Sequence, residues 1–139
     1  MTQVLLMAHG ELAPAMKNSV EMIFGEVPFF TAISFYKEEG LEAISTKIEQ
    51  AIITTDEPIF IFADLFCGTP YNASCAVAMK YPNREIEIVS GMSLPLVLEV
   101  VTTIQTVNLR EMTDLVMLFS KDTVKRFEIE AIDRDDDDL

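Results

Sequence analysis

Four short apolar segments alternate with stretches of helical periodicity along this chain of 139 residues. The segments are rich in aliphatic and aromatic side chains and cover residues 4–8, 29–35, 59–63 and 86–90. Strands that are buried on both faces of a parallel sheet have this composition. Successive strand–helix–strand units favour right-handed crossovers. The pattern therefore predicts an α/β fold with an open, mostly parallel four-stranded sheet and helices on both faces.

The helices between these segments are predicted from apolar residues that recur every three or four positions. In the first helix, which Gly25 ends, the expected core stripe consists of Leu12, Met16, Val20, Ile23 and Phe24. In the second, over residues 41–53, the expected buried side consists of Ile44, Ile48, Ile52 and Ile53. Further helices are expected over residues 71–80 and 94–104, and a last one is expected to begin at Asn108 as N-cap, with Glu111 three residues later.

Near the end of the chain, the spacing of the apolar residues changes from helical to alternating. Residues 124–132 place Phe127, Ile129 and Ala131 at alternate positions, which is typical of a strand. Because this strand follows two helices, we expect it to run antiparallel at an edge of the sheet. The sequence thus predicts one domain over residues 1–132 and an acidic, solvated tail over residues 133–139.

Charge and hydropathy limit the classes of partner. The formal charge is −13, and the clustered Lys and Arg that a nucleic-acid surface needs are missing. Half of the residues are hydrophobic, which is high for a small domain and favours contact with a protein partner. No apolar stretch is long enough to span a bilayer, and residues 4–8 lack the basic leader of a signal peptide. We expect a cytoplasmic protein.

Candidate catalytic or ligand-binding residues follow three of the predicted strands. In an open α/β sheet, ligands bind outside the carboxyl ends of the strands. His9 and Gly10 follow the first strand, residues 64–70 follow the third, and residues 90–93 follow the fourth. These three loops are expected to open on one edge of the sheet.

His9 is the single histidine of the chain and lies where a buried strand turns towards a helix. Asp64 has the corresponding place after the third strand. It is expected either to accept a hydrogen bond from one imidazole nitrogen, leaving a lone pair on the other, or to cap the structure that follows. The segment Cys67-Gly68-Thr69-Pro70 combines a glycine, a hydroxyl and a helix start, which together suit a phosphate.

Other catalytic classes fail on spacing. A cysteine phosphatase needs an arginine shortly after its nucleophile, but the corresponding positions after Cys67 and Cys75 hold Ala73 and Tyr81. The segment around Ser93 lacks the second glycine of a nucleophile elbow, and no histidine follows it. The P-loop pattern is missing, and one histidine with scattered carboxylates predicts no metal site. We expect both cysteines to be free thiols.

Three segments together resemble a known family, the A components (EIIA) of the mannose, fructose and N-acetylgalactosamine class of bacterial phosphotransferase systems (PTS). V-L-L-M-A-H-G, ending at Gly10, resembles the opening strand with its phosphorylated histidine. A-D-L-F-C-G-T-P-Y-N, from Ala63, resembles the D-L-F-G-G-[ST]-P-[FY]-N signature, and S-G-M-S-L-P-L-V-L-E, from Ser90, resembles G-x-N-L-P-M-L-L-E. Cys67 departs from a family glycine, which matters if that residue takes a positive φ angle, and Ser93 departs from an asparagine.

The resemblance implies a phosphotransferase relay without a cofactor. His9 would accept a phosphoryl group from phospho-HPr and pass it to a histidine of the EIIB component for sugar uptake, with Asp64 orienting the imidazole. The residues implied to bind the phosphoryl group are Phe66, Cys67, Gly68 and Thr69. The residues implied to line the site are Gly10, Gly91, Met92 and Ser93.

The resemblance also implies a homodimer that exchanges its C-terminal strand, and indirect association with the membrane components EIIC and EIID. Two alternatives stay open at this point. One is a regulatory EIIA relative whose phosphorylation reports transport flux. The other is a tetrapyrrole metal chelatase, which also begins with a strand that ends in a similar A-H-G turn.

Overall fold

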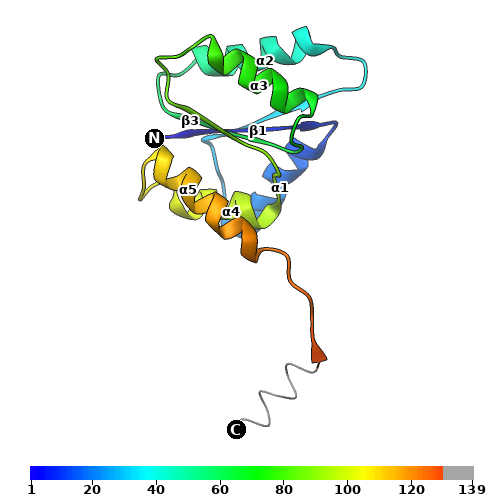
Figure 1. Ribbon diagram of the computed structural model, residues 1–139, viewed down its shortest axis with the longest axis vertical. Coiled ribbons are helices and arrows are strands. Elements are labelled where there is room, and N and C mark those ends of the chain that lie inside the picture. Colours follow the sequence, from blue (N-terminus) through cyan, green and yellow to red (C-terminus); the bar gives the residue numbers. More distant parts are fainter. Residues whose placement is uncertain (130–139) are drawn as a thin grey trace.

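The computed structural model describes residues 1–129 of the chain. A parallel sheet with the strand order β2-β1-β3-β4 lies between two layers of helices (Figure 1). The strands are β1 (Gln3–His9), β2 (Phe30–Phe35), β3 (Ile59–Ala63) and β4 (Ile86–Val89). One face is covered by α1 (Leu12–Phe24), α4 (Leu94–Thr103) and α5 (Leu109–Phe119), and the other by α2 (Leu41–Ile53) and α3 (Thr69–Met79). The predicted open α/β fold with four parallel strands is confirmed.

The two central strands carry the core. In β1, Val4 and Leu6 face the layer of α1, α4 and α5, whereas Leu5 and Met7 face α2 and α3. All five residues of β3 are buried. Burial on both faces explains why these strands are continuous apolar runs. The outer strand β4 is only half-buried over its first three residues, because it pairs with β3 alone among the described residues.

The predicted core stripe of α1 is partly wrong. Val20 is buried and Met16 packs against the core, but Leu12, Ile23 and Phe24 are exposed. The buried stripe starts at Ala13 instead, and Val27 fills the core beyond the last turn of the helix.

In α2 the buried residues are Ile44, Ile48 and Ile52, as predicted, while Ile53 is exposed. An adjacent residue is rotated away from a stripe of residues spaced by four, so Ile53 cannot share that face.

The helix boundaries follow local chemistry. Asn108 caps α5 as predicted: its Oδ1 accepts the backbone N–H of Glu111 at 2.8 Å, and its Nδ2 lies 3.3 Å from the carboxylate of Glu111. Gly25 lies at the end of α1 with a φ of 115°, which suits glycine. Helix α3 begins at Thr69, so Pro70 occupies an early helical position where its missing N–H costs nothing.

After α5 and a short 3-10 turn (Ser120–Asp122), the chain extends away from the domain (Figure 1). Of the strand expected over residues 124–132, residues 124–129 are described, and they pair with none of the described strands. Val124, Phe127 and Ile129 are exposed. The other residues of that expected strand, and the acidic tail over residues 133–139, lie outside the described residues. The edge strand therefore stays a prediction.

Within residues 1–129, none of the helices has the length and apolar character needed to cross a membrane.

Candidate functional site

The pairing of β1 with β3 brings two distant residues together at the carboxyl edge of the sheet. The strands are neighbours, with Met7 opposite Ala63. His9 is the last residue of β1, and Asp64 directly follows β3, where its backbone N–H donates to the carbonyl of Met7. Sheet register alone therefore places a carboxylate beside the only histidine of the chain.

Asp64 holds the imidazole of His9 through one carboxylate oxygen. Oδ2 lies 2.9 Å from Nδ1 and also accepts the backbone N–H of His9 at 3.0 Å. An ionised carboxylate only accepts hydrogen bonds, so Nδ1 carries the proton and Nε2 keeps its lone pair. The side chain of His9 is 47% exposed and that of Asp64 only 11%. Of the two roles expected for Asp64, the structure shows the hydrogen bond to the imidazole of His9.

Two further contacts fix the imidazole ring. The ring of Phe35, at the end of β2, meets it edge to face with 5.7 Å between the centroids. In addition, a Cβ atom added to Gly68 would lie 3.2 Å from Cε1 of His9 and 3.3 Å from the carbonyl oxygen of Leu65. A side chain at Gly68 would therefore be tightly packed against the imidazole.

The loop between β3 and α3 is bent at Cys67. Its φ angle is 63°, a left-handed conformation that is rare for residues other than glycine. The carbonyl of Cys67 accepts Nδ2 of Asn72, and the N–H of Gly68 donates to the carbonyl of Leu65. Among the described residues, the N–H groups of Phe66, Cys67 and Thr69 find no backbone carbonyl. Unpaired N–H groups at a helix start suit an anion.

The loop after β4 contacts the end of β3, next to Asp64, from within the core. Met92 is buried in the core, and its N–H donates to the carbonyl of Ala63, next to Asp64. Gly91 takes a φ angle of 84°. Two polar atoms of these loops, Oδ1 of Asp64 and Oγ of Ser93, are buried without a hydrogen-bond partner in the described structure. Met92, expected to line the site, thus supports it from within the core.

Comparison with known proteins decides the family. The family model of the "EIIA-man: PTS system fructose IIA component" matches residues 3–117. The chain belongs to the mannose-type EIIA family of the PTS. It is 38% identical over 120 residues to the PTS system sorbose-specific EIIA component of Lacticaseibacillus casei, covering 83% of each chain. It is 40% identical over 109 residues to the sorbose-specific EIIA component of Klebsiella pneumoniae, covering 78% of each chain.

Solved structures agree with this EIIA fold. The mannose/sorbose specific IIA subunit from Enterococcus faecalis has a TM-score of 0.82 and 25% identity, covering 92% of this chain and 96% of that chain. An EIIA component from Streptococcus agalactiae has a TM-score of 0.86 and 24% identity, covering 91% of this chain and 98% of that chain, and supports the fold alone. Membership of the PTS family sets aside the tetrapyrrole chelatase.

The site of this EIIA chain is open surface. Two hollows of about 580 and 540 Å³ lie elsewhere, and neither is lined by His9 or Asp64. Within residues 1–129, no three His, Cys, Asp or Glu side chains are grouped so that they could hold a metal ion.

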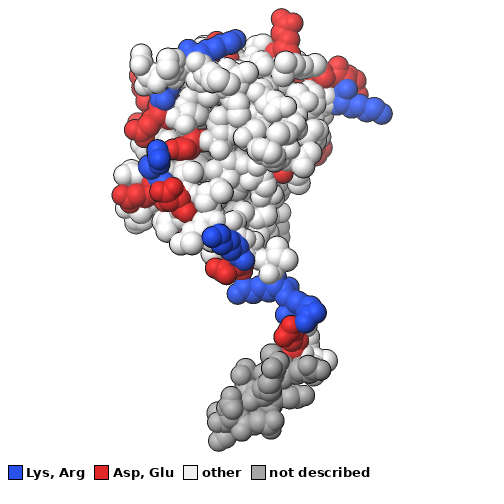
Figure 2. All heavy atoms as spheres, in the orientation of Figure 1, with Lys and Arg blue, Asp and Glu red and all other residues white. Residues whose placement is uncertain are grey.

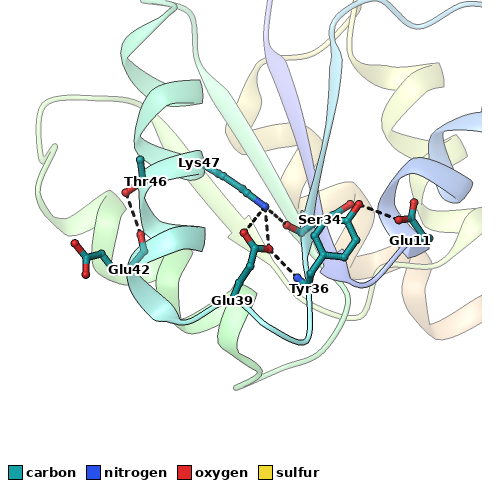
Figure 3. Close-up of polar contacts among 7 residues, drawn as sticks. All are labelled: Glu11, Ser34, Tyr36, Glu39, Glu42, Thr46 and Lys47. Atoms are coloured by element: carbon teal, nitrogen blue, oxygen red, sulfur yellow. Dashed lines mark hydrogen bonds and ion pairs between the residues drawn. The ribbon is translucent and has the colours of Figure 1, made fainter.

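Sequence reasoning missed the loop after β2, which also borders this edge of the sheet. The hydroxyl of Tyr36 donates to Oε1 of Glu11 at 2.8 Å, tying this loop to the turn after His9 (Figure 3). Lys47 from α2 donates to the carbonyl of Ser34 at 2.9 Å and pairs with Glu39 at 2.7 Å. That ammonium lowers the pKa of Glu39, and the backbone N–H of Tyr36 lowers it further. The rule that ligands bind after strand ends would have indicated Tyr36 too.

The conformation of Cys67 yields a stability prediction. Cys67→Gly removes the steric cost of the left-handed conformation but adds backbone entropy to the unfolded chain, so we expect the free energy of unfolding to rise by about 0.5–1 kcal/mol. Cys67→Ala is the matched control, because it removes the thiol and keeps Cβ. Urea unfolding of the three proteins measures the difference. A Cys67→Gly protein no more stable than Cys67→Ala would contradict the assignment of strain.

Proposed function

We propose that Nε2 of His9 receives a phosphoryl group from phospho-HPr and passes it to a histidine of the EIIB component during sugar uptake. The observation that carries this proposal is the bond from Asp64 to Nδ1, which leaves Nε2 as the available nucleophile. Membership of the EIIA family supports a role in a phosphotransferase relay. The chain acts on another protein, and its half-exposed imidazole on an open surface suits a protein donor.

The proposed step moves one phosphoryl group from one histidine to another, so one N–P bond forms as one N–P bond breaks. The lone pair of Nε2 forms the new N–P bond, while the donor's N–P bond breaks and its nitrogen keeps the electron pair. The imidazole of His9 gains positive charge as it takes the phosphoryl group. The carboxylate of Asp64, 2.9 Å from Nδ1, is placed to stabilise that charge and to hold the ring in line. Delivery to EIIB is the same step in reverse with a different partner.

The β3–α3 loop provides the phosphoryl cradle in this proposal. The N–H groups of Phe66, Cys67 and Thr69 are available to phosphoryl oxygens, together with the hydroxyl of Thr69. Gly68 contributes through its lack of a side chain, because its own N–H is used within the loop. Gly10, whose φ angle is 57°, turns the chain away from the acceptor. Phosphoryl transfer needs such positioned donors more than covalent machinery.

The remaining partners follow from the relay. HPr and EIIB dock in turn at the carboxyl edge, where Leu65 and Phe66 are exposed apolar side chains beside His9. The chain works in the cytoplasm and reaches the membrane components EIIC and EIID only through EIIB. We take residues 1–132 as one domain.

We also propose a homodimer. Strand β4 is an open edge, and residues 124–129 extend from the domain with Phe127 and Ile129 exposed. An open strand edge invites a further strand. Residues 124–132 of one copy then form an antiparallel strand on β4 of a second copy, in a two-fold arrangement.

The acceptor is tested with phosphoenolpyruvate, enzyme I and HPr, followed by intact-mass analysis. One phosphoryl group is expected, labile to acid and stable to base, and His9→Ala should abolish it because Nε2 is lost. A second arm adds EIIB: transfer onward supports transport, whereas labelling without delivery indicates a regulatory relative. Equal labelling of His9→Ala would refute His9 as acceptor.

Asp64→Asn tests the orienting carboxylate. The amide keeps the shape but cannot stabilise positive charge on the ring, so phosphoryl transfer should slow by roughly one to three orders of magnitude. The protein should stay folded, which circular dichroism can check. Asp56→Asn, in the exposed turn before β3, is the control. Transfer by Asp64→Asn at the parental rate would reduce Asp64 to a structural role.

The dimer is tested by two truncations and light scattering. A chain that ends at Thr123 loses the exchanged strand and should be monomeric or aggregate, because an open edge is left. A chain that ends at Arg134 loses only the last acidic residues and should remain dimeric. A monomeric full-length protein, or a stable dimer of the shorter chain, would contradict the exchange.

A further inference from the structure

The phosphoryl site of this chain is acidic. A phosphoryl group brings negative charge to an imidazole that already contacts the carboxylate of Asp64, and Glu11 lies just beyond Gly10. Among the described residues, no Lys or Arg makes a hydrogen bond or ion pair with His9 or Asp64. Sites that transfer phosphoryl groups normally supply cationic donors to the phosphoryl oxygens. The described domain lacks such a donor at its acceptor.

Cationic side chains gather instead on the segment that leaves the domain. Lys125 and Arg126 lie on this segment, and Lys121 lies in the 3-10 turn just before it, in a chain of net charge −13. Figure 2 shows the blue side chains on this segment, outside the body of the molecule. Arg126 is largely exposed and contacts only Glu128, two residues further along the same segment. Within residues 1–129, Arg126 makes no hydrogen bond or ion pair with the domain that the segment leaves.

The segment begins at the edge of the sheet that carries His9. Helix α5 runs in the same direction as β4: Arg110, at its start, lies 4.0 Å from Glu87 near the start of β4. Met117, near its end, shares a hollow with Ser90 and Phe66, which follow β4 and β3. The chain therefore leaves α5 at the carboxyl edge, with only residues 120–123 before the segment.

An antiparallel strand on β4 has its first residues beside the carboxyl end of β4. Lys125 and Arg126 are such first residues in the exchanged strand proposed above, on which this inference rests. They come to lie beside Ser90 and Phe66, over the hollow that Ile88, Val89 and Met117 also line. Phe127 and Ile129 follow along the strand, away from the acceptor.

The remaining distance suits a long side chain. The imidazole of His9 is bonded to Asp64 and lies close to Gly68, both of which follow β3. A strand beyond β4 lies two strand spacings from β3, or roughly 10 Å. The guanidinium of Arg126 has the planar fork that matches phosphoryl oxygens, whereas Lys125 offers a point charge.

We infer that Arg126 of one subunit completes the phosphoryl site of the other by donating to the phosphoryl oxygens on His9. The occupant of the β4 edge is a second copy of this chain, and the site is incomplete in a single copy. Lys125 adds charge at the same place.

The first test measures phosphoryl transfer from phospho-HPr to the full-length dimer. Arg126→Gln should slow transfer per site by roughly two to three orders of magnitude, as loss of one positioned donor does. Arg126→Lys should restore part of the rate. Lys80→Gln, an exposed change after the end of α3 at the opposite edge, is the charge-matched control and should leave the rate unchanged. Arg126→Gln at the parental rate would overturn the inference.

A mixed dimer separates donation within a subunit from donation between subunits. A dimer of one His9→Ala chain and one Arg126→Gln chain, co-expressed with different tags, has one acceptor, which faces the intact Arg126 of its partner. That acceptor should react at the parental rate per site. A dimer of one unchanged chain and one His9→Ala, Arg126→Gln chain should react slowly. The reverse result would place Arg126 at the site of its own subunit and overturn the inference that it donates to the other subunit.

Light scattering on the same samples distinguishes failure of the proposed function from failure of this inference. If the unchanged protein takes up no phosphoryl group, the proposed function fails and this inference with it. If it is phosphorylated as a monomer, the function stands and the inference falls. If Arg126→Gln is dimeric and slow, the inference is supported, because a purely structural role would have changed the assembly.

Discussion

The bond between Nδ1 of His9 and Oδ2 of Asp64 depends on the pairing of two parallel strands, and the proposed chemistry of the chain depends on that bond. The residues lie 55 positions apart and meet only because β1 and β3 are adjacent in register. A slip of one residue would turn every side chain of a strand to the opposite face. The fully buried residues of β3, and Leu6 and Met7 of β1, make such a slip costly. The packing of the core therefore fixes the orientation of the imidazole of His9.

The sequence predicted most of what buried strands and helix caps determine. The four parallel strands, the stripe of Ile44, Ile48 and Ile52, and the cap at Asn108 follow from local patterns with one dominant physical cause. The exposure of Ile23, Phe24 and Ile53 did not follow, because apolar character alone does not say which helix face meets the sheet. At the site, His9, Asp64 and the β3–α3 loop were predictable from their places after strands. The bond between Tyr36 and Glu11 was not, since it joins two loops through tertiary contact.

Cys67 illustrates how a resemblance and a conformation inform one another. A family glycine at this position had one physical explanation, a backbone with positive φ, and the observed angle of 63° agrees with it. The chain keeps the bend with a residue that pays a steric cost there. The neighbouring Gly68 is constrained for a different reason, because a Cβ atom there would lie 3.2 Å from Cε1 of His9. Two adjacent positions in one loop are thus constrained by backbone conformation and by contact, respectively.

A relay site has to bind a phosphoryl group without trapping it. In the proposed relay, donation by the loop N–H groups stabilises the phosphoryl oxygens, whereas the carboxylate of Asp64, bonded to Nδ1 of His9, repels them and stabilises the ring. Because the two terms oppose each other on the phosphoryl group, the phosphorylated state need not be a deep minimum, and transfer in either direction stays possible. The buried, unpartnered Oδ1 of Asp64 adds to this balance, because its charge is not quenched by a second donor in the described structure. If Arg126 of a second subunit completes the site as inferred, the phosphoryl group is stabilised only where the subunits are assembled, which ties the proposed reactivity of His9 to assembly.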